Sequence, residues 1–289
     1  LLSHILCMSR VRMVKDHPLL ILEHDGESVE RGKGDRAIKR ESRRTLERYL
    51  IAADLHIGFE HELATKGIRM DSSYVKEMLD ELLSIARDEH CNGIVLLGDI
   101  KDSTRGMSRE EWSSIPSFIT ELARHLELYI VPGNHDSYLR RFMPDSVRLM
   151  SSKGMLIGDT LLMHGHTSPS VGITTVRRMV MGHLHPTLAS SDSILSGERV
   201  WMILKVEASD HMLDIVVMPS LNRYMTMLHR RSRYGNSNNS NNSNNSNNGI
   251  IQLLRRLIGS NLTIMKAVIL TLDGSVVGDE NTLIQAYSL

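Results

Sequence analysis

The sequence has few cysteines, few aromatic residues and no excess of charge of either sign. Only two cysteines, Cys7 and Cys91, occur in 289 residues, and neither has a second Cys or a His nearby at zinc-finger spacing. This excludes a disulfide-stapled scaffold and predicts a reducing, cytoplasmic location. The 34 basic residues balance the 34 acidic ones, so the chain as a whole is not a polyanion-binding surface. A role with nucleic acid would need a local basic patch.

Long hydrophobic runs are also missing. No apolar run approaches the roughly 20 residues that span a bilayer, so no membrane association is expected. Residues 1–13 have no basic region before their apolar part and no clear cleavage site, and we expect neither a signal peptide nor folded core there. The 17 methionines, beside two Trp, seven Tyr and three Phe, predict a core filled largely by flexible thioether side chains.

We expect one domain over residues 14–289, interrupted by two segments that do not resemble folded core. Residues 28–48 carry eight Arg or Lys against four acids, which predicts a solvated loop or helix, with a nucleic-acid contact as the alternative. Residues 236–248 read NSNNSNNSNNSNN and contain no apolar group to bury, so we expect disorder there. Residues 249–289 should then return a strand or two to the domain.

Short apolar runs alternate with segments of helical periodicity. Helices are predicted at 74–89 and at 112–126, with Pro116 early in the second helix, where proline is tolerated. Strand, helix, strand alternation in the first half indicates an α/β layered fold, and the strand-rich second half indicates a second sheet packed on the first. The predicted strands are 19–22, 49–53, 93–97, 128–132, 155–163, 179–181, 200–206, 212–218 and 265–272.

Five short polar motifs follow predicted strands almost directly. In layered α/β folds, sites assemble in the crevice beyond the carboxyl ends of the strands, so we expect these motifs to converge. They are Asp54-Leu55-His56, Gly98-Asp99-Ile100-Lys101-Asp102, Gly133-Asn134-His135-Asp136, His164-Gly165-His166 and Gly182-His183-Leu184-His185.

The residue types in these motifs predict a metal centre. Asp, His and Asn without any Cys form an oxygen and nitrogen donor set suited to Mn, Fe or Zn. In an extended segment, residues two apart point to the same side, which would bring Asp54 together with His56, and His183 with His185. Seven candidate ligands are too many for one ion and suit two ions bridged by a carboxylate. They are Asp54, His56, Asp99, Asn134, His164, His183 and His185.

In this order, the motifs resemble those of the calcineurin-like metallophosphoesterase superfamily, from about residue 50 to residue 186. The stretches ADLHIGFEHEL and DIVVMPSLN further resemble the archaeal Icc-type, SbcD-related phosphoesterases, cousins of the DNA-ligase-associated phosphoesterases. The resemblance implies a four-layer α/β/β/α sandwich with the site at one edge. It also implies two divalent ions, Mn first, with Fe, Zn or Ni accepted. It assigns the ligands as Asp54, His56 and His185 to the first ion, Asn134, His164 and His183 to the second, and Asp99 between them.

The resemblance also implies a mechanism, in which a metal-bound hydroxide attacks the phosphorus of a phosphoester. His135 would lie over the phosphate, where it stabilises the transition state or protonates the leaving oxygen. Asp102 would hold His135 in its working orientation. His166 is expected beside the ligands rather than among them, and Arg140 and Arg141 either hold a substrate phosphate or lie on a solvated helix face.

The predicted function is therefore a dinuclear metal-dependent hydrolysis of a phosphodiester, with nucleotides or nucleic acid as candidate substrates. The neutral charge, the low aromatic content and the lack of a legible stacking platform count against nucleic acid. The alternatives are a phosphomonoesterase or phosphoprotein phosphatase, and a non-catalytic scaffold with the same fold. Retention of His135 with all seven ligand positions favours catalysis over the scaffold.

Overall fold

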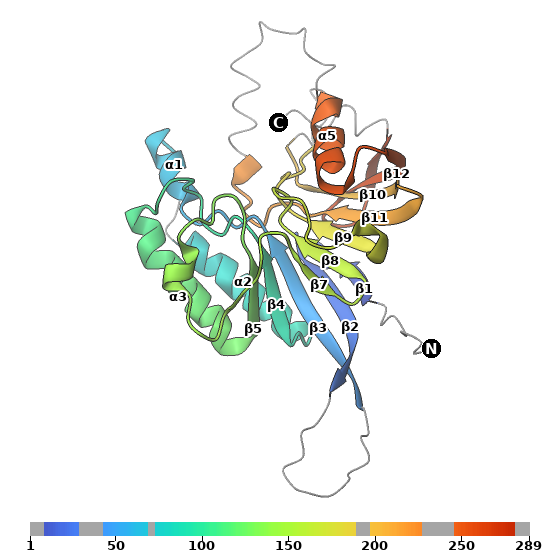
Figure 1. Ribbon diagram of the computed structural model, residues 1–289. Helices are drawn as coiled ribbons and strands as arrows, with labels where there is room; N and C mark the ends of the chain where they lie inside the picture. Colours follow the sequence, from blue (N-terminus) through green and yellow to red (C-terminus); the bar gives the residue numbers. More distant parts are fainter. Residues whose placement is uncertain (1–8, 29–42, 69–72, 189–196, 227–245, 281–289) are drawn as a thin grey trace, which may run out of the picture.

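The computed structural model describes residues 9–28, 43–68, 73–188, 197–226 and 246–280. Two β-sheets face each other, and helices cover their outer faces (Figure 1). Strands β3 to β6 of the first sheet run parallel to one another. The first sheet has the order β1 (Ser9–Met13), β2 (Leu20–Ser28), β3 (Arg43–Ala53), β4 (Gly93–Leu97), β5 (Glu127–Val131) and β6 (Arg148–Leu149).

The second sheet is mostly antiparallel, but β9 runs parallel to both β8 and β11. Its order is β13 (Val276–Asp279), β12 (Leu262–Thr271), β10 (Val200–Ala208), β11 (His211–Val217), β9 (Arg178–Met181), β8 (Thr160–Met163) and β7 (Met155–Ile157). The helices are α1 (Phe59–Thr65), α2 (Tyr74–Asp88), α3 (Arg109–His125) and α5 (Ser246–Ile258), with the short 3₁₀ turns η1 (Leu139–Phe142) and η2 (Ile173–Thr175). None of the helices in the described ranges is long and apolar enough to cross a membrane.

Alternation along β3 decides which core each side chain joins. Leu50 and Ala52 pack with α2 and α3, whereas Ile51 and Ala53 face the second sheet. Helix α5 covers the other side of the second sheet, where Leu254 joins a core rich in methionine. Three apolar cores therefore separate four layers, and the α/β/β/α sandwich expected from the sequence is confirmed.

Most predicted strands and both predicted helices occur in the structure, with two changes in detail. The run 155–163 is a hairpin of β7 and β8 rather than one strand, because Gly158 takes a left-handed turn at φ 58°. Helix α3 begins earlier than expected, because Ser108 and Glu111 form a capping box at its start. Pro116 consequently lies inside α3, three residues farther from the helix start than expected.

The expectation that residues 1–13 lie outside the folded core is wrong for Ser9–Met13, which form β1 and pair with β2. Val11 and Met13 pack against the core between the sheets, while Arg10 and Arg12 face solvent. This alternation of apolar and charged residues is typical of a strand. Strand β1 therefore extends the fold to residues before the expected boundary at Val14. Residues 1–8 lie outside the described residues.

Two further expectations need partial correction. Within the basic segment 28–48, Ser28 ends β2 and residues 43–48 begin β3, so these residues form strands rather than a loop or helix. Residues 29–42 lie outside the described residues. Of the Asn/Ser tract, residues 246–248 form the first turn of α5, which the sequence did not predict, and residues 236–245 are not described.

Candidate metal centre

The five motifs lie at the carboxyl ends of five strands. Asp54, Asp99 and Asn134 follow the parallel strands β3, β4 and β5, while His164 and His183 follow the parallel pair β8 and β9. Since the two sheets face each other, these ends meet at one edge of the sandwich. The sequence prediction that the motifs converge is consistent with this arrangement.

The backbone is left-handed rather than extended at five of the seven candidate ligands. Asp54, His56 and Asp99 have φ of 57°, 44° and 46°, and His183 and His185 have 72° and 43°. Each such residue costs about 1 to 2 kcal/mol relative to a right-handed conformation. The alternation argument used for the sequence therefore gave the wrong local geometry. Hydrogen bonds between loops hold this conformation, including the one from the His56 N–H to the Asp99 carbonyl at 2.8 Å.

One group of converging side chains comprises Asp54, His56, Asp99 and His185. Each offers a ligand atom, and the four atoms lie within 4.8 Å of one another. His185 Nε2 lies 3.3 Å from His56 Nε2 and 3.3 Å from Asp54 Oδ1, and His56 Nε2 lies 3.8 Å from Asp99 Oδ2. This group contains the three residues expected at the first ion together with the expected bridge.

A second group comprises Asp99, His164 and His183, whose ligand atoms also lie within 4.8 Å of one another. His164 Nε2 lies 3.3 Å from Asp99 Oδ2 and 3.2 Å from Asn134 Oδ1. Asp99 therefore belongs to both groups, and the structure brings all seven predicted ligands to one place. His166 belongs to neither group; its buried Nδ1 has no hydrogen-bond partner among the described residues.

The ring nitrogens of the buried histidines suit a cation between them. His56 Nδ1 donates to Asp102 Oδ1 at 3.1 Å, and His164 Nδ1 donates to the Leu97 carbonyl at 3.1 Å. With Nδ1 as the donor, each Nε2 lies on the side of the ring that faces Asp99, where it would present its lone pair to a bound cation. Oxygen and nitrogen donors converging in this way fit hard or borderline divalent ions such as Mn, Fe or Zn.

The electrostatics of the centre also favour a cation. Burial would raise the pKa of Asp54, but the nearby His185, His164 and His56 outweigh it and lower that pKa. Burial would likewise raise the pKa of Asp99, but the nearby His164 outweighs this effect and lowers that pKa. Burial lowers the pKa of His164, yet Asp99 and Asp54 together raise it to about 9. Burial, aided by His164, lowers the pKa of His183 to about 4. Two ionised carboxylates thus lie buried in a shell of histidines.

Asp102 holds a different histidine with its side chain from the one expected. Its carboxylate accepts from His56 Nδ1, whereas its backbone carbonyl accepts the hydrogen bond from His135 Nδ1. His135 lies beside the centre, with its Nε2 3.9 Å from Asp99 Oδ2. The prediction that Asp102 orients His135 by its carboxylate is therefore corrected, because the carboxylate is already paired with His56.

Several residues that support the loops have no role in the sequence prediction. Glu111 is fully buried and accepts the backbone N–H groups of Asp102 at 3.0 Å and Ser103 at 2.7 Å. Asn222, beyond β11, donates its side-chain N–H to the carbonyls of Leu55 at 3.1 Å and His56 at 3.3 Å. Asn222 lies five residues beyond the end of β11, and a polar residue in the loop after a predicted strand was the available signal for it.

Asp136 braces the loops rather than joining the ligands. Its Oδ1 accepts from the Ile100 N–H at 2.8 Å and its Oδ2 accepts from the Gly133 N–H at 2.8 Å. These bonds tie the loop after β4 to the loop after β5, and so fix Asp99 relative to Asn134.

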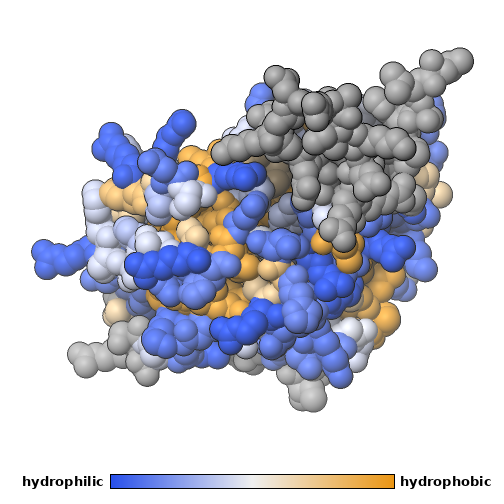
Figure 2. All heavy atoms as spheres, turned by 90° about the horizontal axis from the view of Figure 1, so that it is seen from below, coloured by the Kyte–Doolittle hydropathy of each residue, from blue (hydrophilic) through white to orange (hydrophobic). Residues whose placement is uncertain are grey.

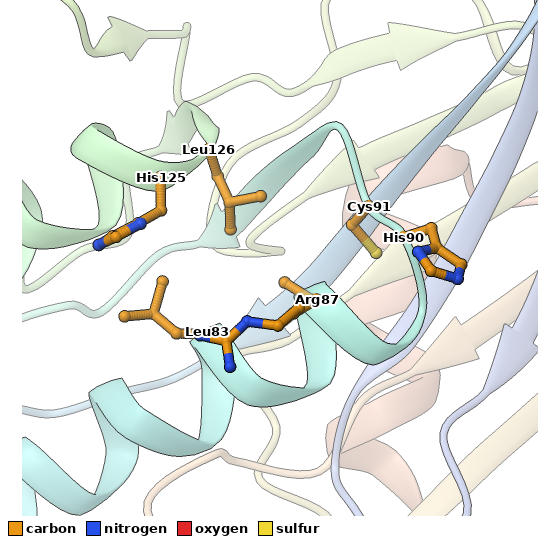
Figure 3. Close-up of a pocket in the computed structure, with 7 residues that line it drawn as sticks. Leu83, Arg87, His90, Cys91, His125 and Leu126 are labelled. Atoms are coloured by element: carbon orange, nitrogen blue, oxygen red, sulfur yellow. The ribbon is translucent and has the colours of Figure 1, made fainter.

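A separate pocket of about 250 Å³ lies between the ends of α2 and α3 (Figure 3). Cys91 lies two residues before β4 and Leu126 one residue before β5, so the pocket lies at the amino ends of these strands. Figure 2 views the molecule from this end, where apolar residues show between hydrophilic ones. The pocket is thus separated from the candidate metal centre by the length of the strands.

The chain matches one family model and is similar to several solved structures. A family model described as calcineurin-like phosphoesterase matches residues 47–221, more than half of the chain. A nuclease MPE from Pseudomonas putida is similar in structure, with a TM-score of 0.39 and 15% identity over 60% of this chain and 74% of that one. The phosphoesterase Yfce from E. coli has a TM-score of 0.37 and 13% identity, over 80% of this chain and 97% of that one. No curated protein sequence matches the chain. On the family match, which spans all five motifs, the chain belongs to the calcineurin-like phosphoesterase family.

Proposed function

We propose that this protein is a phosphodiesterase that uses two divalent metal ions, Mn being the first candidate. The observation that carries the proposal is the position of Asp99, which lies in both groups of converging ligand atoms. A carboxylate shared by two groups is the arrangement expected of two ions held side by side. The first ion would be held by Asp54, His56 and His185, the second by Asn134, His164 and His183.

When bound, two such ions would lower the pKa of a water molecule and offset the negative charge that develops on the phosphoryl oxygens. The chain's own groups would orient the substrate and move protons. We assign the proton transfer to His135. Its Nδ1 donates to the Asp102 carbonyl, which leaves Nε2 directed toward the centre, and its side chain is 21% exposed. Nε2 can therefore hold the proton that the leaving oxygen needs.

Asp102 is a positioning residue in this proposal. Its carboxylate keeps His56 Nδ1 protonated and its carbonyl does the same for His135. One residue thereby fixes the tautomer of a proposed ligand and of the proposed acid. We further propose that the protein acts in a reducing, cytoplasmic compartment, in keeping with its low cysteine content, and that residues 14–289 form a single domain, to which β1 also belongs.

The proposal is tested by hydrolysis of bis-p-nitrophenyl phosphate and of p-nitrophenyl phosphate by metal-stripped protein with added Mn. We expect Mn-dependent cleavage of the diester that falls at least a hundredfold in His135→Ala, while metal content stays unchanged. His125→Ala, at the far end of α3, is the matched control and should keep full activity. A preference for the monoester would redirect the proposal to phosphomonoesters. Metal binding without turnover of either ester would favour the non-catalytic scaffold.

A further inference from the structure

Two large aromatic side chains are exposed on the described surface beside the proposed active site. Trp112 and Tyr138 are each 54% exposed, whereas Trp201, Phe59 and Phe118 are buried. Trp112 also packs edge-on against Phe142, with ring centroids 4.3 Å apart and an interplanar angle of 75°. This contact joins the first turn of α3 to the turn η1 and holds Trp112 with part of its surface facing solvent.

Both exposed aromatics come from segments anchored at the site. Tyr138 is three residues beyond His135, so their Cα atoms are within about 11 Å of each other. Trp112 directly follows Glu111, whose carboxylate accepts the backbone N–H of Asp102 at 3.0 Å. A nucleic-acid strand lying over Trp112 and Tyr138 would therefore reach His135 within the length of a few nucleotides.

The same segments carry exposed positive charge. Residues 104–112 and 137–146 contain four exposed arginines, which are Arg105, Arg109, Arg140 and Arg141. The exposed acids in the same two ranges are Glu110 and Asp145. No ion pair among the described residues involves any of the four arginines. The Arg141 guanidinium lies 5.2 Å from the centre of the Tyr138 ring, which combines a cation with an aromatic face. The surface thus has local positive charge although the whole chain is neutral.

We propose that Trp112, Tyr138, Arg140 and Arg141 form a binding surface for single-stranded nucleic acid that leads into the active site, an inference that rests on the proposed phosphodiesterase function. Unpaired bases stack on exposed aromatic rings, and arginines contact the phosphates between them. Bases in a duplex are already stacked on one another, so this surface would favour single strands. A protein partner would be expected to supply acids for these arginines, and an acidic peptide is the probe for that alternative.

The inference is tested by equilibrium binding of fluorescein-labelled oligo(dT) and oligo(rU) to metal-stripped protein, in which cleavage is prevented. We expect the Kd to rise about tenfold in Trp112→Ala and in Tyr138→Ala, and to be largely restored in Trp112→Phe. Removal of Arg140 and Arg141 together should reduce the dependence of the Kd on salt concentration. Arg124→Ala, exposed on the far end of α3 and paired with Glu121, is the matched control and should bind as the parent does.

Tryptophan fluorescence provides a second readout. The chain has two Trp residues, and Trp201 is fully buried, so quenching by an unlabelled oligonucleotide should come from Trp112 and vanish in Trp112→Phe. Far-UV circular dichroism and the thermal midpoint establish that each variant is folded. Unchanged affinity in both alanine variants, or quenching that persists in Trp112→Phe, would overturn the inference.

The outcomes separate this inference from the proposed function. Turnover of bis-p-nitrophenyl phosphate without oligonucleotide binding would overturn only the binding surface. Oligonucleotide binding without turnover of either ester would overturn the phosphodiesterase and support the surface. Binding of an acidic peptide, with no binding of either oligonucleotide, would overturn the inference in favour of a protein partner. The comparison of oligo(dT) with oligo(rU) decides which nucleic acid is preferred.

Discussion

Glu111, in the first turn of α3, accepts the backbone N–H of Asp102 with its Oε1 at 3.0 Å. The same oxygen accepts from Ser103 at 2.7 Å, and Oε2 accepts from Ser108 at 2.6 Å to complete the capping box. Gly58, two residues after His56, approaches so closely that a Cβ there would lie 2.7 Å from Glu111 Cγ. A single buried carboxylate therefore starts a helix and positions two loops of the candidate centre.

Replacement of Glu111 should reduce both stability and activity. We expect Glu111→Ala to lower the free energy of unfolding by about 2 to 4 kcal/mol, because it removes the cap and leaves buried N–H groups unpaired. Glu111→Gln keeps an oxygen for Asp102 and Ser103 and should recover part of this loss. Chemical denaturation measures the effect, and exposed Glu110→Ala is the control. Equal stability of Glu111→Ala and Glu110→Ala would contradict the positioning role.

Removal of the Asp102 carboxylate should weaken the binding of one metal ion more than that of the other. Its hydrogen bond to His56 Nδ1 supports the first proposed ion, whereas His164 depends on the Leu97 carbonyl. Loss of the hydrogen-bond acceptor of a ligating histidine typically lowers metal affinity about 10- to 100-fold. We therefore expect calorimetric titration of Asp102→Ala with Mn to show one weakened and one unchanged binding step, and Asp145→Ala to show two unchanged steps.

Removal of the metal should lower the thermal midpoint of the protein. Each ion that binds only the folded state would stabilise it by about 2.7 kcal/mol at 100 times its Kd, which corresponds to roughly 5 to 10 °C per ion for a chain of this size. Differential scanning calorimetry with EDTA and with Mn measures this shift. Asp99→Asn removes the charge common to both groups and should abolish the response. A full response in Asp99→Asn would count against the bridge.

Two glycines should be irreplaceable because carboxylates lie against them. A Cβ at Gly182 would lie 2.6 Å from Asp54 Oδ2, and one at Gly133 would meet Asp99 Oδ1. Gly133→Ala and Gly182→Ala should displace these oxygens and lower metal binding at least tenfold. Gly172→Ala is the control, since its nearest neighbour is a Thr174 side-chain oxygen at 3.8 Å. Metal content after dialysis distinguishes the three variants.

Cys91 should react slowly at neutral pH. Burial, with a smaller contribution from Glu89, raises the pKa of its thiol to about 11. Only the thiolate reacts, so a raised pKa reduces the rate below pH 11 and shifts the rise in rate to higher pH. In a Cys7→Ser background, we expect iodoacetamide to react with Cys91 at pH 8 about tenfold more slowly than with an ordinary cysteine. A rate that levels off near pH 9 would contradict the assignment.

Local patterns in the sequence determined much of this protein. Continuous apolar runs such as 93–97 gave buried strands, and the periodicity of 74–89 gave α2, because these segments bury one face or both irrespective of their partners. The polar motifs after the strands predicted the seven candidate ligands. Helix α5 was not predicted, because the Asn/Ser tract overlaps its first turn. Its apolar face can be recognised only from its packing on the second sheet.

The sequence by itself determined which residue types stand at the ends of the strands, and therefore the donor set of the candidate centre. Only the tertiary structure decided which atoms meet. The Asp102 carboxylate accepts a hydrogen bond from His56 rather than from His135. The aromatic rings of Trp112 and Phe142, which are 30 positions apart in the chain, pack against each other. The reason is physical: strand burial and ligand type are local properties, whereas left-handed loop backbones and contacts between loops depend on hydrogen bonds from distant segments.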